Sequence, residues 1–191
     1  MHYLILLLFM VSCGVNKETK YFKVVRHDPL VNFGNNKDIQ YFNINANDDT
    51  LSSTYPVEVN KKYTEIEQLD MIRELLTMES DERICSYPVM NWNTFLSQLY
   101  SDTLKQYSIQ VEALFLINQV YFDNPFSYSP LPVLTNTENT QNETISGSII
   151  QQAYRDYKDW YIQLKRIGLK EARVQGVKPL QNSNVKWLYG N

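Results

Sequence analysis

The sequence predicts a mainly α fold: a compact helical bundle or a short array of helical hairpins, preceded by an extended or short-stranded N-terminal segment. Two observations support this. After residue 63 the apolar residues recur at intervals of three and four, the period of an amphipathic helix. Before that point they fall in short runs rich in aromatic and β-branched residues, separated by turn-forming residues. We therefore expect an N-terminal segment over 13–62 and a helical domain over 63–191.

The N-terminal segment contains three runs with the composition of strands, namely Tyr21–Val25, Ile39–Ile44 and Thr54–Val59. Asn- and Asp-rich stretches separate them, as expected for turns. Two or three short strands and a wrapped extended arm both fit this pattern, and part of the region could also serve as a spacer.

The first helix is predicted from Thr64 to about Met78. Thr64 and Glu67 have the spacing of a capping box, in which the Thr oxygen accepts from a first-turn amide and the Glu side chain reaches back. A second helix is predicted to start at Asn91 or Asn93 and to end near Gln106.

Ser108 is predicted to cap a third helix, which is apolar almost all round as far as Tyr121. A strand competes for its second half, but its length favours a helix. A helix with so little polar surface should lie at the centre of the domain.

Proline residues interrupt the chain after Phe122, and the polar stretch Thr135–Gly147 is predicted to be a surface loop. The next helix is expected to run from Ser148 to Ile167, where Gly168 ends it. A short helix over Leu169–Gln175 should follow. The final expectation is that Trp187 and Tyr189 fix the C-terminal tail to the core.

The first residues predict an export signal. The apolar run Tyr3–Val11 is nine residues long, too short to cross a hydrocarbon core of about 30 Å as a helix. It has the character of a signal-peptide h-region, so residues 1–12 are expected to be a signal peptide.

The stretch Met10-Val11-Ser12-Cys13-Gly14 resembles a bacterial lipobox, with Met10 where that family usually has leucine. The resemblance implies a lipid on Cys13 and a membrane anchor, since two acyl chains suffice for stable attachment. It also implies a place in the bacterial cell envelope, at the periplasmic face or the outer membrane. The alternatives are a leader without lipid, or a buried N-terminal strand with a chance cysteine.

The net charge of −3 conceals an uneven distribution of charge. Thr64–Glu82 contains seven acidic residues and one base, whereas Gln151–Asn191 contains eight bases and three acids. The two segments could complement each other inside the fold, or the basic one could meet an acidic partner or anionic headgroups. The bases form no dense run, so we expect no nucleic-acid partner.

No catalytic or metal-binding motif is recognisable, and we expect neither enzymatic activity, nor a cofactor, nor a metal ion. The sequence has two histidines, one of them within the leader. Cys85 lies beside apolar residues and is expected to be a buried, inert thiol. Adjacent carboxylates such as Asp48 and Asp49 are expected to be solvated.

Aromatic side chains are the remaining candidates for a binding surface. Most of the stripe on helix 148–167 should face the core, opposite Arg155, Asp156, Lys158 and Asp159. Within that stripe Tyr157 is expected to be half exposed, and Phe126 and Tyr128 in the proline-rich loop should lie at the surface.

Together these features predict an envelope-anchored lipoprotein that acts as a non-enzymatic protein-binding module, such as an immunity protein or an accessory subunit. The alternative is a lipoprotein that captures glycans or peptides with its aromatic residues.

Overall fold

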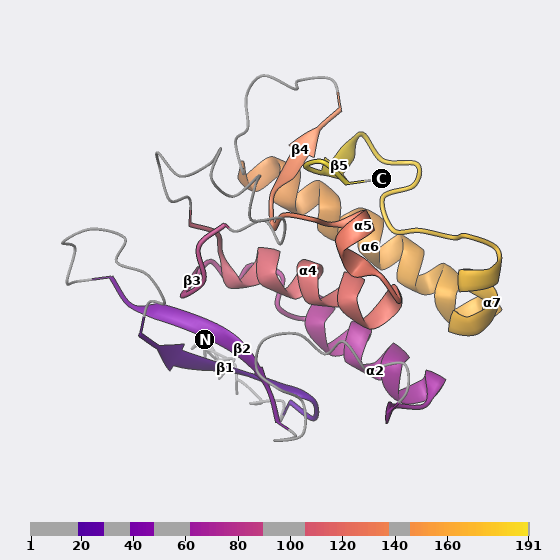
Figure 1. Cartoon of the computed structure of the whole chain (residues 1–191), viewed down its shortest axis with the longest axis horizontal. Coiled ribbons are helices and arrows are strands. Elements are labelled where there is room, and N and C mark those ends of the chain that lie inside the picture. Colours follow the sequence, from indigo (N-terminus) through magenta and orange to yellow (C-terminus); the bar gives the residue numbers. More distant parts are fainter. Residues whose placement is uncertain (1–18, 29–38, 48–61, 90–105, 138–145, 191) are drawn as a thin grey trace, which may run out of the picture.

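The computed structural model describes residues 19–28, 39–47, 62–89, 106–137 and 146–190. Helices account for 46% of these residues and strands for 17%, so the predicted mainly α class is wrong and the fold is mixed α/β (Figure 1). The strands form two small sheets in the order β1-β2-β3 and β4-β5. The elements in chain order are β1 (Phe22–His27), β2 (Tyr41–Ala46), α2 (Glu65–Leu76), β3 (Ile84–Cys85), α4 (Ile109–Tyr121), α5 (Pro125–Tyr128), β4 (Leu134–Asn136), α6 (Gly147–Ile167), α7 (Leu169–Val174) and β5 (Val185–Trp187).

The class prediction failed because three strands are very short. β3 has two residues, and β4 and β5 have three each, so none is long enough to show a period of two in the sequence. β4 pairs antiparallel with β5 across the chain, with Leu134 opposite Trp187. It includes the start of the stretch that the sequence analysis assigns to a loop.

The two strands predicted earliest in the chain are confirmed as β1 and β2. They pair antiparallel, with Phe22 opposite Ala46, and β2 pairs parallel with β3. The N-terminal strands are therefore part of the same sheet as a strand from the middle of the chain. The expected strand Thr54–Val59 and the expected helix after Asn91 lie outside the described residues.

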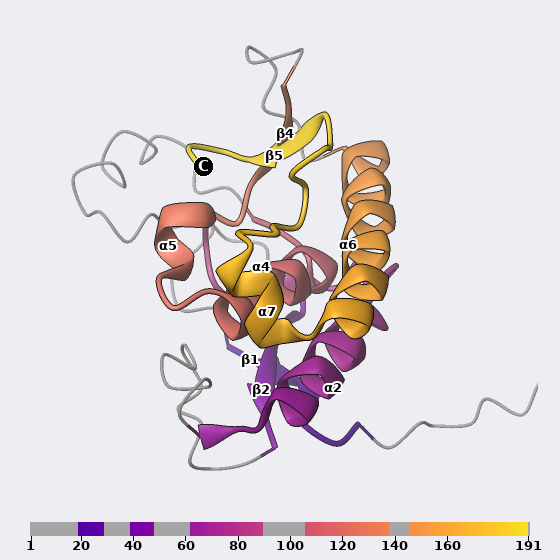
Figure 2. The same cartoon turned by 90° about the vertical axis from the view of Figure 1, so that its right-hand side faces the viewer.

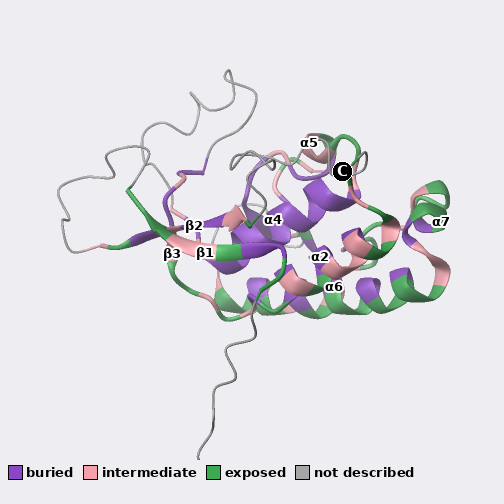
Figure 3. Cartoon of the chain, turned by 90° about the horizontal axis from the view of Figure 1, so that it is seen from below, coloured by how far each residue is buried: buried purple, intermediate pink, exposed green. Residues whose placement is uncertain are grey.

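Helix α4 lies at the centre of the described fold, as predicted (Figure 1). All thirteen of its residues are buried, and it contacts α2, α5, α6, β2 and β3. Figure 3 shows the contrast with α6, which has one buried side and one exposed side. Continuous apolar character in the sequence thus marks the innermost helix.

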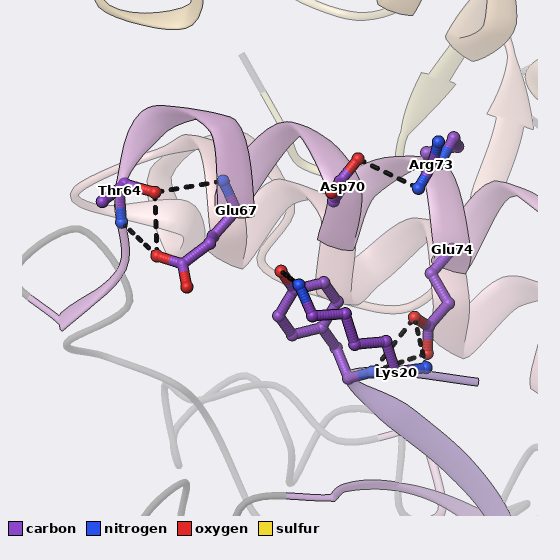
Figure 4. A network of polar contacts seen from close by, with 7 residues as sticks. Lys20, Thr64, Glu67, Asp70, Arg73 and Glu74 are labelled. Atoms are coloured by element: carbon purple, nitrogen blue, oxygen red, sulfur yellow. Dashed lines mark hydrogen bonds and ion pairs between the residues drawn. The ribbon is translucent and has the colours of Figure 1, made fainter. Parts of the chain in front are cut away.

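Helix α2 begins with the predicted capping box. The backbone N–H of Glu67 donates to Thr64 Oγ1 over 3.3 Å, and the N–H of Thr64 donates to Glu67 Oε2 over 2.8 Å (Figure 4). Its inner side buries Met71, Ile72, Leu75 and Leu76 against the core.

Helix α6 begins at Gly147, one residue earlier than expected, and Ser146 caps it. It ends at Gly168, as predicted, and α7 follows on its flank (Figure 2). Gly168 has φ +87°, and a Cβ there would lie 3.0 Å from Glu65 Oε1. The positive φ therefore favours glycine here, and a larger residue would also displace the Glu65 carboxylate.

Of the two residues predicted to fix the C-terminal tail to the core, only Trp187 is buried. Trp187 on β5 is 1% exposed and packs its ring against Phe115, with the ring centroids 5.8 Å apart. Tyr189, by contrast, has 59% of its surface exposed.

Candidate functional site

The aromatic residues predicted for binding are mostly in the core. Tyr157 is fully buried, which corrects the expectation that it is half exposed. Its hydroxyl accepts from Trp187 Nε1 over 2.8 Å and donates to Asn118 Oδ1 over 2.6 Å. Burial raises the pKa of Tyr157 well above its ordinary value. This side chain holds three elements together and offers no surface to a ligand.

Tyr128 at the end of α5 is also buried, and its hydroxyl donates to the carbonyl oxygen of Pro179. Of the predicted loop aromatics, Phe126 is half-buried on the same short helix. Cys13, the predicted lipid site, lies outside the described residues. The structure thus brings Tyr128 and Tyr157 into one core and leaves Phe126 at its edge.

Glu112 is a buried carboxyl group that the sequence analysis did not single out. It lies on α4 with 6% of its surface exposed, and its Oε2 accepts from the Tyr107 hydroxyl over 2.7 Å. Burial raises the pKa of Glu112 to about 7, and the Tyr107 hydrogen bond lowers it in part. The only charged residue in a helix that is apolar almost all round was the signal that could have identified it.

Cys85 on β3 lies close enough to Glu112 for the carboxylate to add to the effect of burial, and both raise the pKa of this thiol. Cys85 is free and buried, as predicted. A thiol with a raised pKa in an enclosed setting is a poor nucleophile.

The first described residues of the chain are held by one carboxylate (Figure 4). Glu74 on α2 accepts from the backbone N–H groups of Lys20, Tyr21 and Phe22, at distances of 2.7 to 3.1 Å. The Tyr21 ring also packs edge-on against Tyr63, 6.3 Å between centroids. The entry of the chain into β1 is thereby fixed to the end of α2.

The acidic and basic segments pack side by side, but the ion pair between them lies at the surface rather than inside the fold. Glu65 on α2 accepts from the backbone N–H groups of Leu169 and Lys170 at the start of α7. Lys158 on α6 forms an ion pair with Glu79. Other bases of the C-terminal segment remain at the surface.

The exposed side of α6 is basic around one apolar residue. Ile162 has 61% of its surface exposed. Its neighbours one turn away on the helix are Lys158, Asp159, Lys165 and Arg166. Arg155 lies two turns before it on the same stripe. Four exposed bases thus accompany one exposed acid on this helix.

Two cavities lie beside the C-terminal segment, of about 490 Å³ and about 240 Å³. Both are lined by Lys178, Leu180, Gln181 and Ser183, so this turn forms the wall between them. Ser183 itself is engaged, because its hydroxyl donates to Asp156 Oδ2 over 2.5 Å. Trp160, which lines the smaller cavity, has a buried Nε1 atom without a hydrogen-bond partner among the described residues.

Within the described ranges, no group of three or more His, Cys, Asp or Glu residues could hold a metal ion. In the same ranges, none of the helices is both long enough and apolar enough to span a bilayer. Neither a protein-family model, nor a curated protein, nor a solved structure matches this chain.

Proposed function

We propose that this chain is an envelope-anchored lipoprotein, tethered through a lipid on Cys13, whose folded domain acts as a non-enzymatic protein-binding module. The observation that carries the proposal is the short connection between the anchor and the fold. Thr19, the first described residue, is six positions after Cys13. At about 3.5 Å per residue, that connection spans at most roughly 21 Å.

The attachment at the domain end supports the same proposal. Glu74 binds three successive backbone N–H groups from Lys20 to Phe22, so the chain is fixed to α2 from Lys20 onward. A lipid at Cys13 would therefore keep the domain close to the bilayer. The exposed side of α6, with its bases around Ile162, gives such a domain a surface that a protein could recognise.

The alternative of glycan or peptide capture loses its main support. Stacking against a sugar or peptide needs aromatic rings at the surface. Tyr128 and Tyr157 are buried, and their hydroxyl groups bond within the core. We therefore retain the protein-binding proposal.

The test is to express the full chain and its Cys13→Ala variant in a bacterium, fractionate the membranes and measure intact masses. We expect the parent protein in the membrane fraction, without residues 1–12 and with a diacylglyceryl group on Cys13. The Cys13→Ala variant should leave that fraction or keep its first twelve residues. Cys85→Ala is the matched control and should remain anchored, because Cys85 is enclosed in the core. A free thiol at residue 13 of the parent protein would refute the anchor.

A further inference from the structure

We propose that the exposed side of α6 is a docking surface and that its occupant is a protein with an acidic surface, located at the membrane that holds the tether. The inference rests on the proposed function and names the chemistry of its partner. We define the α6 face as Arg155, Lys158, Asp159, Ile162, Lys165 and Arg166.

The charges of the α6 face are largely uncompensated. Lys158 is paired with Glu79. Arg155 donates to the neutral Gln152 side chain over 2.6 Å, and Lys165 lies over the Tyr161 ring at 5.2 Å. Within the part of the chain that the structure describes, no carboxylate forms an ion pair with Arg155, Lys165 or Arg166. Three positive charges are thus available to an acidic partner.

The apolar centre of the face has the position of an interface anchor. Ile162 lies one helical turn from Lys158, Lys165 and Arg166, so long basic side chains border an exposed aliphatic group. Interfaces commonly place an apolar residue at the centre and polar residues at the rim. Ile162 contributes little to the core, because the core side of α6 is formed by Ala153, Tyr154, Tyr157 and Leu164.

The helix is rigid, which favours recognition without rearrangement. Its inner residues Tyr154 and Leu164 are fully buried, and Ser146 caps its N-terminus. The Tyr154 hydroxyl donates to the Gln110 carbonyl oxygen over 2.8 Å. The backbone beneath this face therefore loses little conformational entropy on binding.

The location of the tether places the partner near the membrane. In Figure 2 the described chain begins beside α2, on the side of the molecule that carries α6. There Lys20 lies within electrostatic range of Glu67 and Asp70 on α2. The connection to Cys13 spans at most roughly 21 Å, so this side would lie close to the bilayer.

A protein fits the α6 face better than a lipid surface does. Helix α2, which packs against α6, carries four acids and one base. Asp70 on α2 lies near Tyr161 of α6. A uniformly anionic bilayer would attract α6 and repel its neighbour, whereas a protein can present acidic groups to α6 alone.

The test uses the full lipid-anchored chain with the photoreactive residue p-benzoylphenylalanine at position 162, irradiated in native membranes. Three bases of the face are removed in Arg155→Gln/Lys165→Gln/Arg166→Gln. The control Lys23→Gln/Lys178→Gln/Lys186→Gln removes three exposed bases elsewhere and changes net charge equally. We expect one protein adduct whose yield falls about tenfold in the first variant and not in the control, since each charge at a rim contributes modestly.

The identity of the adduct decides the outcome. An adduct with a protein that carries an acidic surface, lost at high salt, supports the proposal. Adducts to lipid instead of protein overturn it. The absence of any protein adduct also overturns it, if in addition both triple variants bind equally to vesicles with and without phosphatidylglycerol. A yield that does not respond to charge removal overturns it as well. If the parent protein forms the adduct but carries a free thiol at residue 13, the anchor fails while the docking surface stands, so the two proposals are separable.

Discussion

Helices α4 and α6 pack against each other, and one residue of each can be compared: the only charged residue of α4 and the only exposed isoleucine of α6. Glu112 is a carboxyl group inside the fully buried α4, and Ile162 is an aliphatic side chain on the exposed side of α6. A buried carboxyl group is informative by itself, whereas a single exposed isoleucine is informative here only because bases without an ion pair among the described residues surround it. The difference between the two is energetic: ionising Glu112 inside the core costs stability, whereas the exposed Ile162 contributes little to folding and is open to a contact.

The largest expected effect on the free energy of unfolding is that of truncating an apolar residue of α4. Leu114 is fully buried, so Leu114→Ala should lower the free energy of unfolding by about 3–5 kcal/mol through lost transfer energy and a residual cavity. Urea denaturation followed by circular dichroism measures this. A loss below about 1 kcal/mol would contradict the central position of α4.

The next effect concerns the pH dependence of stability. The folded-state pKa of Glu112 is raised from 4.5 to about 7, so the folded state binds this proton more tightly than the unfolded state. The free energy of unfolding should therefore fall as the pH rises from about 4.5 to about 7, by roughly 3 kcal/mol, and then level off. Glu112→Gln should remove this decline.

Urea denaturation between pH 4 and pH 8 measures the decline, because this range includes the pKa of Glu112 in the unfolded and in the folded state. Glu79→Gln is a suitable control, because Glu79 is half-buried and pairs with Lys158 at the surface. The Glu79→Gln variant should keep the decline of the parent protein. An identical slope for Glu112→Gln and the parent would show that Glu112 does not titrate abnormally.

Particular residues show how much of the fold could be predicted from the sequence. The capping box at Thr64 and the buried helix after Ser108 depend on local spacing, and both predictions are confirmed. The fold class was wrong because strands such as β3 form through pairing with distant residues, which no local pattern reveals. The exposure of Tyr157 was wrong because tail residues such as Trp187 fold over it.

Only part of the α6 face could be predicted from the sequence. The charged side of α6, including Arg155 and Lys158, is opposite the apolar stripe as predicted. The position of Ile162 on that charged side was readable from helical spacing, but not singled out. The absence of ion pairs to Arg166 among the described residues required the tertiary structure.

A smaller effect is expected where the chain enters the fold. Glu74→Ala removes the acceptor of the Tyr21 and Phe22 amides and should lower the free energy of unfolding by about 1–2 kcal/mol. Hydrogen exchange at these two amides should become faster. Arg73→Ala is the control, because Arg73 pairs at the surface with Asp70 and should leave both amides protected. Unchanged exchange in Glu74→Ala would contradict the role of this carboxylate.

The smallest effect on stability is expected at the centre of the α6 face. Ile162→Asp should change the free energy of unfolding by less than about 0.5 kcal/mol, because the side chain is 61% exposed. The same variant should release the chain from its partner in co-purification from native membranes. A loss of stability comparable to that of Leu114→Ala would mean that Ile162 serves the core instead.

The most direct test of the functional account is maleimide labelling of single cysteines at two exposed sites, Ile162→Cys and Lys23→Cys. Cys85 contributes little background, because burial raises the pKa of its thiol. The account predicts that both cysteines react rapidly in the purified protein, whereas in native membranes the cysteine at 162 is protected and the one at 23 is not. Equal labelling at the two positions in native membranes would contradict it.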